Sequence, residues 1–161
     1  MKCEKYITGK YALNVHHPGD NNEPTGDWHG YIWDNITELP NKKITYAGNG
    51  FKINTFSIWG DFGIYDDTDN FKKKGIIIKE KYVFVADYYR AILDLIYYNL
   101  LDNENLMGLN CITYDHFDNN KQINVIFDKV KLLNNNINEK QYAHLEDWIL
   151  SEKKYFLQRV A

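Results

Sequence analysis

The stretch VFVADYYRAILDLIYYNLL, residues 83 to 101, constrains the architecture more strongly than any other part of the sequence. Most of its positions are apolar, and the exceptions Asp87, Arg90 and Asp94 recur three or four residues apart. This spacing puts the three charges on one stripe of an α-helix and leaves the rest of the helix surface apolar. The stretch therefore predicts a mostly buried helix from Val83 to Leu101.

Two later segments also carry the helical spacing of apolar residues. The first is predicted from Lys121 to Leu133, with one apolar face made of Ile123, Ile126, Phe127, Val130 and Leu133. The second is predicted from about Glu139 to Val160, where Asn138 is placed as N-cap and Gln141 follows three residues later, close to a capping box. Its predicted apolar face consists of Tyr142, Leu145, Trp148, Ile149, Phe156 and Val160.

Before this helical half, the sequence has the texture of a β-sheet. Residues 6 to 81 hold all three Pro and nine of the ten Gly, and apolar residues alternate with polar ones. Four strands are predicted, over Tyr6–Val15, Lys43–Ala47, Phe51–Ile58 and Gly75–Lys79. Gly48-Asn49-Gly50 predicts a hairpin turn, because Gly and Asn tolerate positive φ. We expect an α+β fold, an N-terminal antiparallel β-sheet region packed with about three C-terminal helices, as one domain over residues 1–161 that is β-rich over 1–81 and α-helical over 82–161.

Bulk properties exclude several classes of protein. With 161 residues, of which 44% are hydrophobic and 16% aromatic, the chain has enough apolar material for the core of one domain. Its longest apolar run, Tyr82–Ala86, is far shorter than the roughly 20 residues that span a bilayer. The N-terminus has no apolar region suited to a signal peptide, so we expect a cytoplasmic protein. The abundant Asn, Ile, Lys, Tyr and Phe have AT-rich codons, which indicates a low-GC bacterial or phage genome.

Charge and motif content argue against two broad functions. A net charge of -3 and only two Arg argue against direct nucleic-acid binding, which neutralises several phosphates at once. The sequence holds no P-loop, dinucleotide-binding or nucleophile-elbow motif, so an enzyme is the less favoured class and no cofactor is expected. Cys3 and Cys111 are isolated thiols without ligand spacing and are expected to be reduced and structural.

The first candidate site is a loop that holds three of the five His. His16, His17 and His29 are weak metal-ligand candidates, because imidazole binds divalent transition metals. Within the loop, the turn Asp27-Trp28-His29 is a candidate for binding a partner or ligand. The alternative is structural: Asp27 caps a turn, Trp28 anchors it to the core and His29 makes a structural hydrogen bond.

The second candidate site is the stripe formed by Asp87, Arg90 and Asp94. The simplest interpretation is an intrahelical network that lets a buried helix carry a charge. The alternative is that Arg90 reaches an anion or a carboxylate of a partner, because guanidinium presents planar, bidentate donors. The surplus of Tyr on the same helix also suggests a protein interface.

Four motifs together suggest a family. They are KYALN at residues 10 to 14, GDWH at 26 to 29, GDFGI at 60 to 64 and RAILDLI at 90 to 96. In this order they resemble a family of small uncharacterised bacterial proteins, often encoded beside nucleotidyltransferase-like toxins of the abortive-infection type. The resemblance implies no enzyme activity and no cofactor. It implies a partner that is a neighbouring-gene toxin or defence protein.

Three functional hypotheses follow. The leading one is a non-enzymatic, protein-binding component of a bacterial defence or toxin–antitoxin locus, antitoxin-like or accessory. The second is a small metal-dependent enzyme that uses His and Asp at the Asp27–His29 loop. The third is a phage-encoded inhibitor of a host defence complex.

Overall fold

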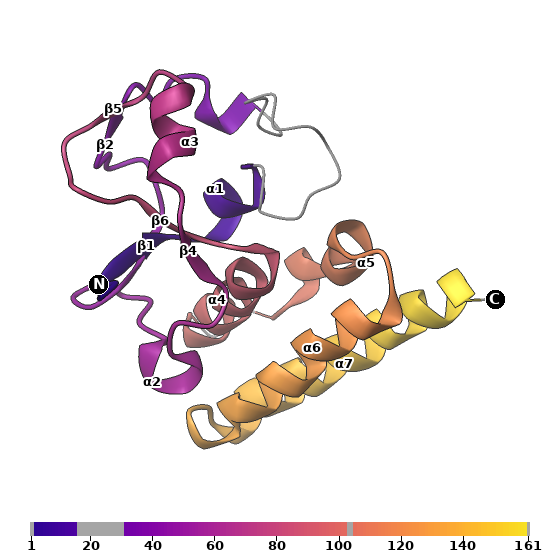
Figure 1. The fold of residues 1–161 in the computed structure, drawn as a ribbon. Helices are drawn as coiled ribbons and strands as arrows, with labels where there is room; N and C mark the ends of the chain where they lie inside the picture. The colour runs from indigo at the N-terminus through magenta and orange to yellow at the C-terminus, as the bar shows by residue number, and fades with distance from the viewer. Residues whose placement is uncertain (1, 16–30, 103–104, 161) are drawn as a thin grey trace. The chain divides into compact units, whose positions relative to one another are not determined.

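The computed structural model describes residues 2–15, 31–102 and 105–160, with side chains up to residue 157. The chain contains both helices and strands, which confirms the α+β class (Figure 1). Its contacts divide it into two compact units, Met1–Ala91 and Ile92–Ala161. The boundary between the two units lies inside a helix, after Ala91. The change from strands to helices was expected ten residues earlier, after Lys81.

Unit 1 is built on a four-stranded sheet with the order β3-β1-β6-β4. These strands are β1 Lys5–Ile7, β3 Tyr46–Gly48, β4 Ile64–Asp66 and β6 Phe84–Ala86. The sheet is mixed, because β1 pairs antiparallel with β3 and parallel with β6, while β4 pairs antiparallel with β6. A second, parallel pair joins β2 Glu38–Leu39 to β5 Ile77–Ile78. Two of the three pairings in the four-stranded sheet are antiparallel, as expected, and the β1–β6 pairing is parallel.

Short helices accompany this sheet. They are α1 Gly9–Leu13, the 3-10 turn η1 Tyr31–Trp33, α2 Phe56–Trp59 and α3 Thr68–Lys73. The core of unit 1 contains side chains from strands and helices alike, among them Tyr6, Ile7, Ala12, Trp33, Phe71 and Val85. Aromatic contacts link them: the rings of Trp33 and Phe71 meet edge to face with centroids 5.3 Å apart.

None of the four predicted strands forms over most of its length. Those expected over Lys43–Ala47 and Gly75–Lys79 keep only Tyr46–Ala47 and Ile77–Ile78. The strand expected over Tyr6–Val15 ends at Ile7, because Gly9 takes φ 65° and the chain turns into α1. The Gly48-Asn49-Gly50 segment does reverse the chain, since Gly48 N–H donates to Ile53 O at 2.8 Å. However, β3 pairs with β1, and the segment expected as the strand Phe51–Ile58 leads instead into α2.

The stretch of residues 83 to 101 forms two elements instead of one helix. Residues Phe84–Ala86 make β6, and the helix α4 covers Tyr88–Leu101. Asp87 separates them: its backbone N–H donates to Gly63 O at 2.7 Å, and its own carbonyl accepts the first helical hydrogen bond, from Ala91. Periodicity alone could not separate the two elements, because a short apolar run fits a buried strand as well as a helix.

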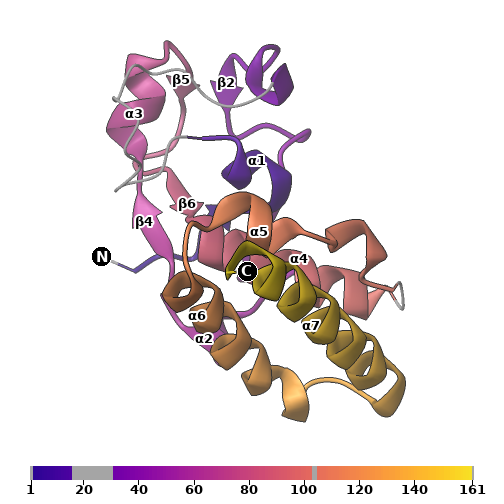
Figure 2. The ribbon, with the colours of Figure 1, turned by 90° about the vertical axis from the view of Figure 1, so that its right-hand side faces the viewer.

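Unit 2 is helical. Besides the C-terminal part of α4, it contains η2 Met107–Leu109, α5 Ile112–His116, α6 Asn120–Val130, η3 Lys131–Asn135 and α7 Glu139–Val160. Figures 1 and 2 both show α6 and α7 side by side. The rings of Phe127 and Trp148 meet between them, with centroids 6.3 Å apart.

The predictions for α6 and α7 hold well. The predicted helix from Lys121 corresponds to α6, which buries Ile123, Ile126, Phe127 and Val130, and the chain then tightens into η3. The predicted capping box of α7 is confirmed: Gln141 N–H donates to Asn138 Oδ1, and Asn138 N–H donates to Gln141 Oε1, both at 2.9 Å. No helix within the described ranges is both long and apolar enough to cross a membrane.

Candidate functional site

Arg90 lies at the centre of unit 1, and its side chain is fully buried. Its Nη1 donates to the carbonyl oxygens of Gly60 and Phe62, both at 2.8 Å. Its Nη2 donates to Thr55 Oγ1 at 3.0 Å, and its Nε donates to Tyr6 Oη at 3.2 Å. These partners all lie outside α4. The guanidinium therefore ties the segment between Thr55 and Phe62 to the helix.

Aromatic rings surround the same guanidinium. The Cζ of Arg90 lies 5.3 Å from the ring centroid of Tyr6, 5.8 Å from that of Trp59 and 6.0 Å from that of Phe56. Rings at this distance attract a cation and help to offset its loss of hydration. With its donors directed to protein oxygens and no exposed surface, Arg90 is a structural residue and offers no open anion site.

Asp87 is the N-cap of α4. Its Oδ1 accepts the backbone N–H of Arg90 at 2.9 Å, which is the bond an N-cap carboxylate makes with the third helical residue. Burial raises the pKa of Asp87, while hydrogen bonds from the backbone N–H groups of Arg90 and Tyr89 and the charge of Arg90 oppose this. Asp94, which follows Arg90 by four residues, is fully buried. Asp87 and Arg90 thus have different structural tasks, and two of the three charged residues of the stripe, Arg90 and Asp94, are closed off from solvent.

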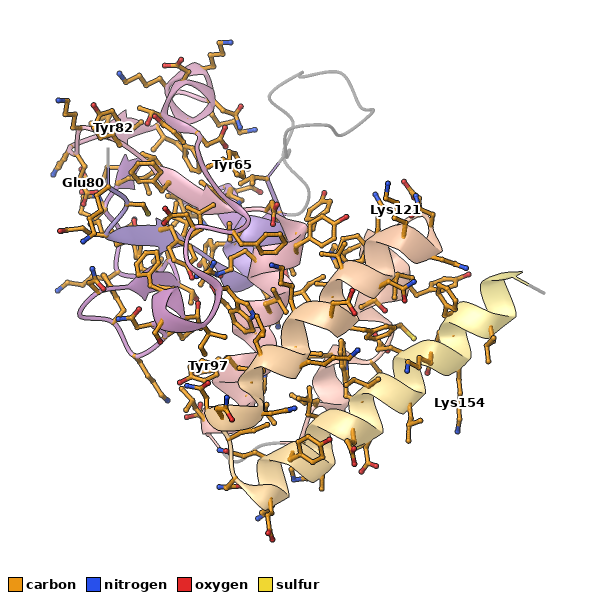
Figure 3. All side chains as sticks on the ribbon, turned by 60° about the horizontal axis from the view of Figure 1, so that its bottom comes forward. Tyr65, Glu80, Tyr82, Tyr97, Lys121 and Lys154 are labelled. Carbon is orange, nitrogen blue, oxygen red and sulfur yellow. The ribbon has the colours of Figure 1, made fainter. Side chains whose placement is uncertain are left out.

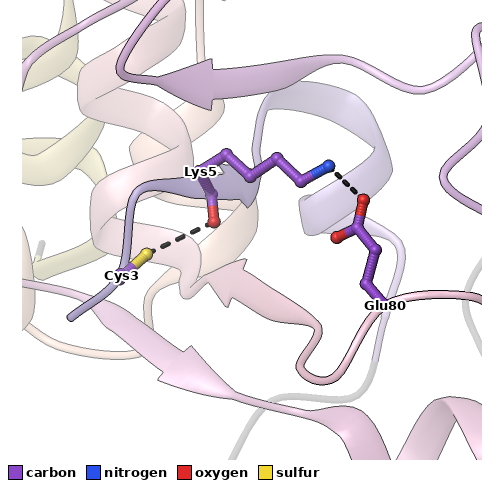
Figure 4. A network of polar contacts seen from close by, with 3 residues as sticks. All are labelled: Cys3, Lys5 and Glu80. Atoms are coloured by element: carbon purple, nitrogen blue, oxygen red, sulfur yellow. Dashed lines mark hydrogen bonds and ion pairs between the residues drawn. The ribbon is translucent and has the colours of Figure 1, made fainter. Parts of the chain in front are cut away.

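A smaller polar network lies near the N-terminus of unit 1 (Figure 4). Lys5 forms an ion pair with Glu80, and its Nζ lies 5.2 Å from the ring centroid of Tyr46. Burial raises the pKa of Tyr46 to about 12. Burial, together with the negative charge of Asp61, raises the pKa of the Cys3 thiol to about 11, and Cys3 Sγ donates to Lys5 O at 3.3 Å. This thiol stays protonated at neutral pH, so it is not an activated nucleophile.

Unit 2 contains a buried carboxylate that sequence reasoning missed. Glu152 of α7 is 1% exposed and accepts three hydrogen bonds: from Cys111 N–H at 3.0 Å, Thr113 N–H at 3.1 Å and Thr113 Oγ1 at 3.0 Å. Burial raises its pKa, and these hydrogen bonds oppose the rise. The signal was available, because Glu152 follows Leu145 and Trp148 at helical spacing on the buried side of α7. Its task is to hold the first turn of α5.

Three large apolar residues are exposed on the outward side of α7, among charged ones. Tyr142 is 41% exposed, Leu150 60% and Leu157 66%, although Tyr142 was predicted on the buried face. Leu145 and Trp148 are buried as predicted. The helix therefore carries apolar residues on two sides. The predicted face misplaced Tyr142 and contained neither Leu150 nor Leu157.

A groove of about 350 Å³ lies between α7 and the α6–η3 segment, beside the exposed Tyr142 and Leu150. Its walls come from α6, η3 and α7, and its lining residues are Val130, Lys131, Asn134, Tyr142, Leu145, Glu146, Ile149, Leu150 and Lys153. In Figure 3 the labelled Lys154 points away from α7. We name the outward surface formed by Tyr142, Glu146, Ile149, Leu150, Lys153 and Leu157 the α7 face.

A second hollow, of about 390 Å³, lies elsewhere in unit 2. It is lined by Asn105, Leu106, Met107, Asn110, His144, Asp147, Trp148 and Ser151. Trp148 is fixed there by its Nε1, which donates to Leu109 O at 3.1 Å. The polar groups line an open surface, and none is buried and aimed into the hollow, so we assign it no ligand.

The predicted residues of the His-rich loop, His16, His17, Asp27, Trp28 and His29, lie outside the described residues. Within the described ranges there is no group of three or more His, Cys, Asp or Glu side chains that could hold a metal ion. Comparisons with protein-family models, with curated proteins and with solved structures found no match to this chain.

Proposed function

We propose that this chain is a non-enzymatic, protein-binding component of a bacterial defence or toxin–antitoxin locus, and that it binds its partner through the α7 face. The observation that carries the proposal is the exposure of Leu150 and Leu157 at 60% and 66% beside an apolar groove. Exposed apolar side chains beside an apolar groove are typical of a protein-interaction site.

The chemistry of the α7 face also supports a protein as ligand. It combines an aromatic residue, Tyr142, with aliphatic side chains and with single charges at Glu146 and Lys153. Aromatic and aliphatic side chains are typical of protein interfaces, where single charges set the register. The chemical groups that the structure places together in unit 1, around Arg90, are already used to hold the fold.

The choice of a toxin or defence protein as partner rests on the four sequence motifs and the net charge of -3. An antitoxin-like component binds the toxin and blocks its action, so its loss restores toxicity. The proposal therefore predicts a stable complex with the product of an adjacent gene, and rescue of cells that express that product.

The test is co-expression of this chain with the adjacent gene product, followed by purification of the complex and a growth assay. Leu150→Glu and Leu157→Glu place a charge on the α7 face and should weaken the complex at least about 30-fold, because an apolar contact is replaced by a buried, unpaired charge. Ile77→Glu is the matched control, since Ile77 is 62% exposed but lies in unit 1.

Two results would overturn the proposal. The first is the absence of both a complex and rescue with the unaltered chain. The second is that Leu150→Glu and Leu157→Glu weaken the complex no more than the control Ile77→Glu does. That result would place the binding surface elsewhere.

A further inference from the structure

The residues of the α7 face repeat every seven positions. Tyr142 and Ile149 are seven residues apart, as are Leu150 and Leu157, and as are Glu146 and Lys153. A seven-residue repeat keeps side chains on one side of a helix and is the pattern by which two helices pack along their length. The groove confirms the shared side, because Tyr142, Glu146, Ile149, Leu150 and Lys153 all line it.

The charges on this face are arranged symmetrically about its middle. The midpoint lies between Ile149 and Leu150. Glu146 and Lys153 lie equally far from it on opposite sides, and so do Tyr142 and Leu157. If a second α7 packs antiparallel about this midpoint, each Glu146 faces a Lys153 of the second copy, and each Tyr142 faces a Leu157. In a parallel pair, by contrast, like charges would face each other.

We propose that the α7 face pairs with the α7 face of a second copy of this chain, antiparallel, with a two-fold axis between Ile149 and Leu150. This inference rests on the proposed function only because both use the α7 face. A second copy of this chain occupies the face when the product of the adjacent gene is absent. A two-fold interface uses the same patch on both copies and closes, so it produces a dimer and no larger assembly.

The size of the face sets the strength of the dimer. Residues 142 to 157 of a helix extend about 22 Å. This is a small interface, so we expect a dissociation constant on the order of 10 µM. A dimer of this strength gives way to a tighter protein partner on the same face. Self-association therefore covers the apolar residues in the free chain and regulates binding by competition.

The experiment is sedimentation velocity of the isolated full chain between about 1 and 200 µM, a range that brackets the expected dissociation constant. The unaltered chain should shift from monomer to dimer across this range. Glu146→Lys and Lys153→Glu each place like charges opposite one another twice per dimer. Each should weaken the dimer at least about tenfold.

Combining the two substitutions provides the decisive measurement. The double variant Glu146→Lys/Lys153→Glu restores opposite charges across the axis and should dimerise like the unaltered chain. An equimolar mixture of the two single variants should also form a dimer, because each supplies the charge that the other needs. Asp147→Lys and Lys154→Glu make the same charge changes at exposed positions of α7 outside the face, and they should leave the dimer unchanged.

The inference is overturned if the unaltered chain remains a monomer up to 200 µM, if the single variants dimerise as it does, or if the double variant does not regain the dimer. Circular dichroism on every variant keeps loss of folding separate from loss of pairing. A monomeric chain that still binds the adjacent gene product overturns the dimer alone. A dimer that fails to bind that product overturns the proposed function alone.

Discussion

The guanidinium of Arg90 donates a 2.8 Å hydrogen bond to the carbonyl oxygen of Gly60, a residue 30 positions earlier in the chain. The same nitrogen bonds the carbonyl oxygen of Phe62 at 2.8 Å. One buried side chain thereby holds both ends of a tight turn within unit 1. Carbonyl oxygens buried in this way depend on their donor, because losing it leaves them without a partner and without water.

Replacing Arg90 by Lys should destabilise the chain markedly. The single ammonium of Lys keeps the charge but cannot place donors toward Gly60, Phe62, Thr55 and Tyr6 at once. We expect the free energy of unfolding to fall by about 3 kcal/mol. Urea denaturation followed by tryptophan fluorescence measures it. The exposed Lys154→Arg should change it by less than about 0.5 kcal/mol, and an equally small effect of Arg90→Lys would contradict the structural role.

Gly63 allows α4 to begin close to the turn after α2. It has φ 73°, and a Cβ there would lie 2.6 Å from Asp87 Oδ1 and 2.7 Å from Arg90 Cβ. Gly63→Ala should therefore cost more than about 3 kcal/mol of unfolding free energy, the sum of backbone strain and displacement of the N-cap. Gly75→Ala separates the two causes, since Gly75 has φ 87° but open space around its Cβ position. It should cost only about 1 kcal/mol, and equal losses in both variants would rule out the close approach.

Asp67 should make stability depend on pH. Burial raises the pKa of Asp67 from 3.8 to about 6, and the hydrogen bond that its Oδ2 accepts from Asn70 at 3.1 Å opposes this only in part. Between pH 3.8 and about pH 6, Asp67 has released its proton in the unfolded chain but still holds it in the folded chain. The folded state therefore loses stability as the pH rises through this window.

The matching variant is Asp67→Asn, which cannot ionise and can still accept from Asn70. Above pH 6 the unfolding free energy of this variant should exceed that of the unaltered chain by about 1 kcal/mol, a value lowered because solvent screens a half-buried group. Below pH 4 the two unfolding free energies should be equal. Thermal unfolding from pH 3.5 to 8 measures the difference. Exposed Asp69→Asn is the control, and a gain from Asp67→Asn that is the same at every pH would refute the titration.

The buried Glu152 of unit 2 invites a pair of substitutions. Glu152→Ala leaves the N–H groups of Cys111 and Thr113 without their acceptor and opens a cavity, so we expect a loss of about 3–4 kcal/mol. Glu152→Gln keeps the shape and one acceptor oxygen and should lose only about 1–2 kcal/mol. Denaturation of both variants, beside the exposed Asp147→Ala, checks this order. The reverse order, or a loss as small as that of Asp147→Ala, would show that α5 does not depend on this carboxylate.

The parts of the fold that were predicted well are those whose causes are local in sequence. Helix α7 begins at Glu139 because Asn138 and Gln141 cap each other within four residues, and the buried face of α6 follows from apolar spacing alone. Both features need only contacts between neighbouring turns of a helix. The candidate site was predicted only in part. Arg90 was identified because it is the only Arg before the C-terminal tail, but its hydrogen-bond partners were not predicted.

The sequence by itself determined the α+β class, the helices α6 and α7 with the capping box of α7, and the importance of Arg90, because composition, periodicity and caps act over a few residues. Only the tertiary structure decided that residues 84 to 86 form a strand, that β3 pairs with β1, and that Arg90 bonds the Gly60–Phe62 turn. It also decided which apolar side of α7 is covered and which is exposed. The physical reason is the same in each case: these features depend on residues far apart in the chain, and their contacts exist only once the chain has folded.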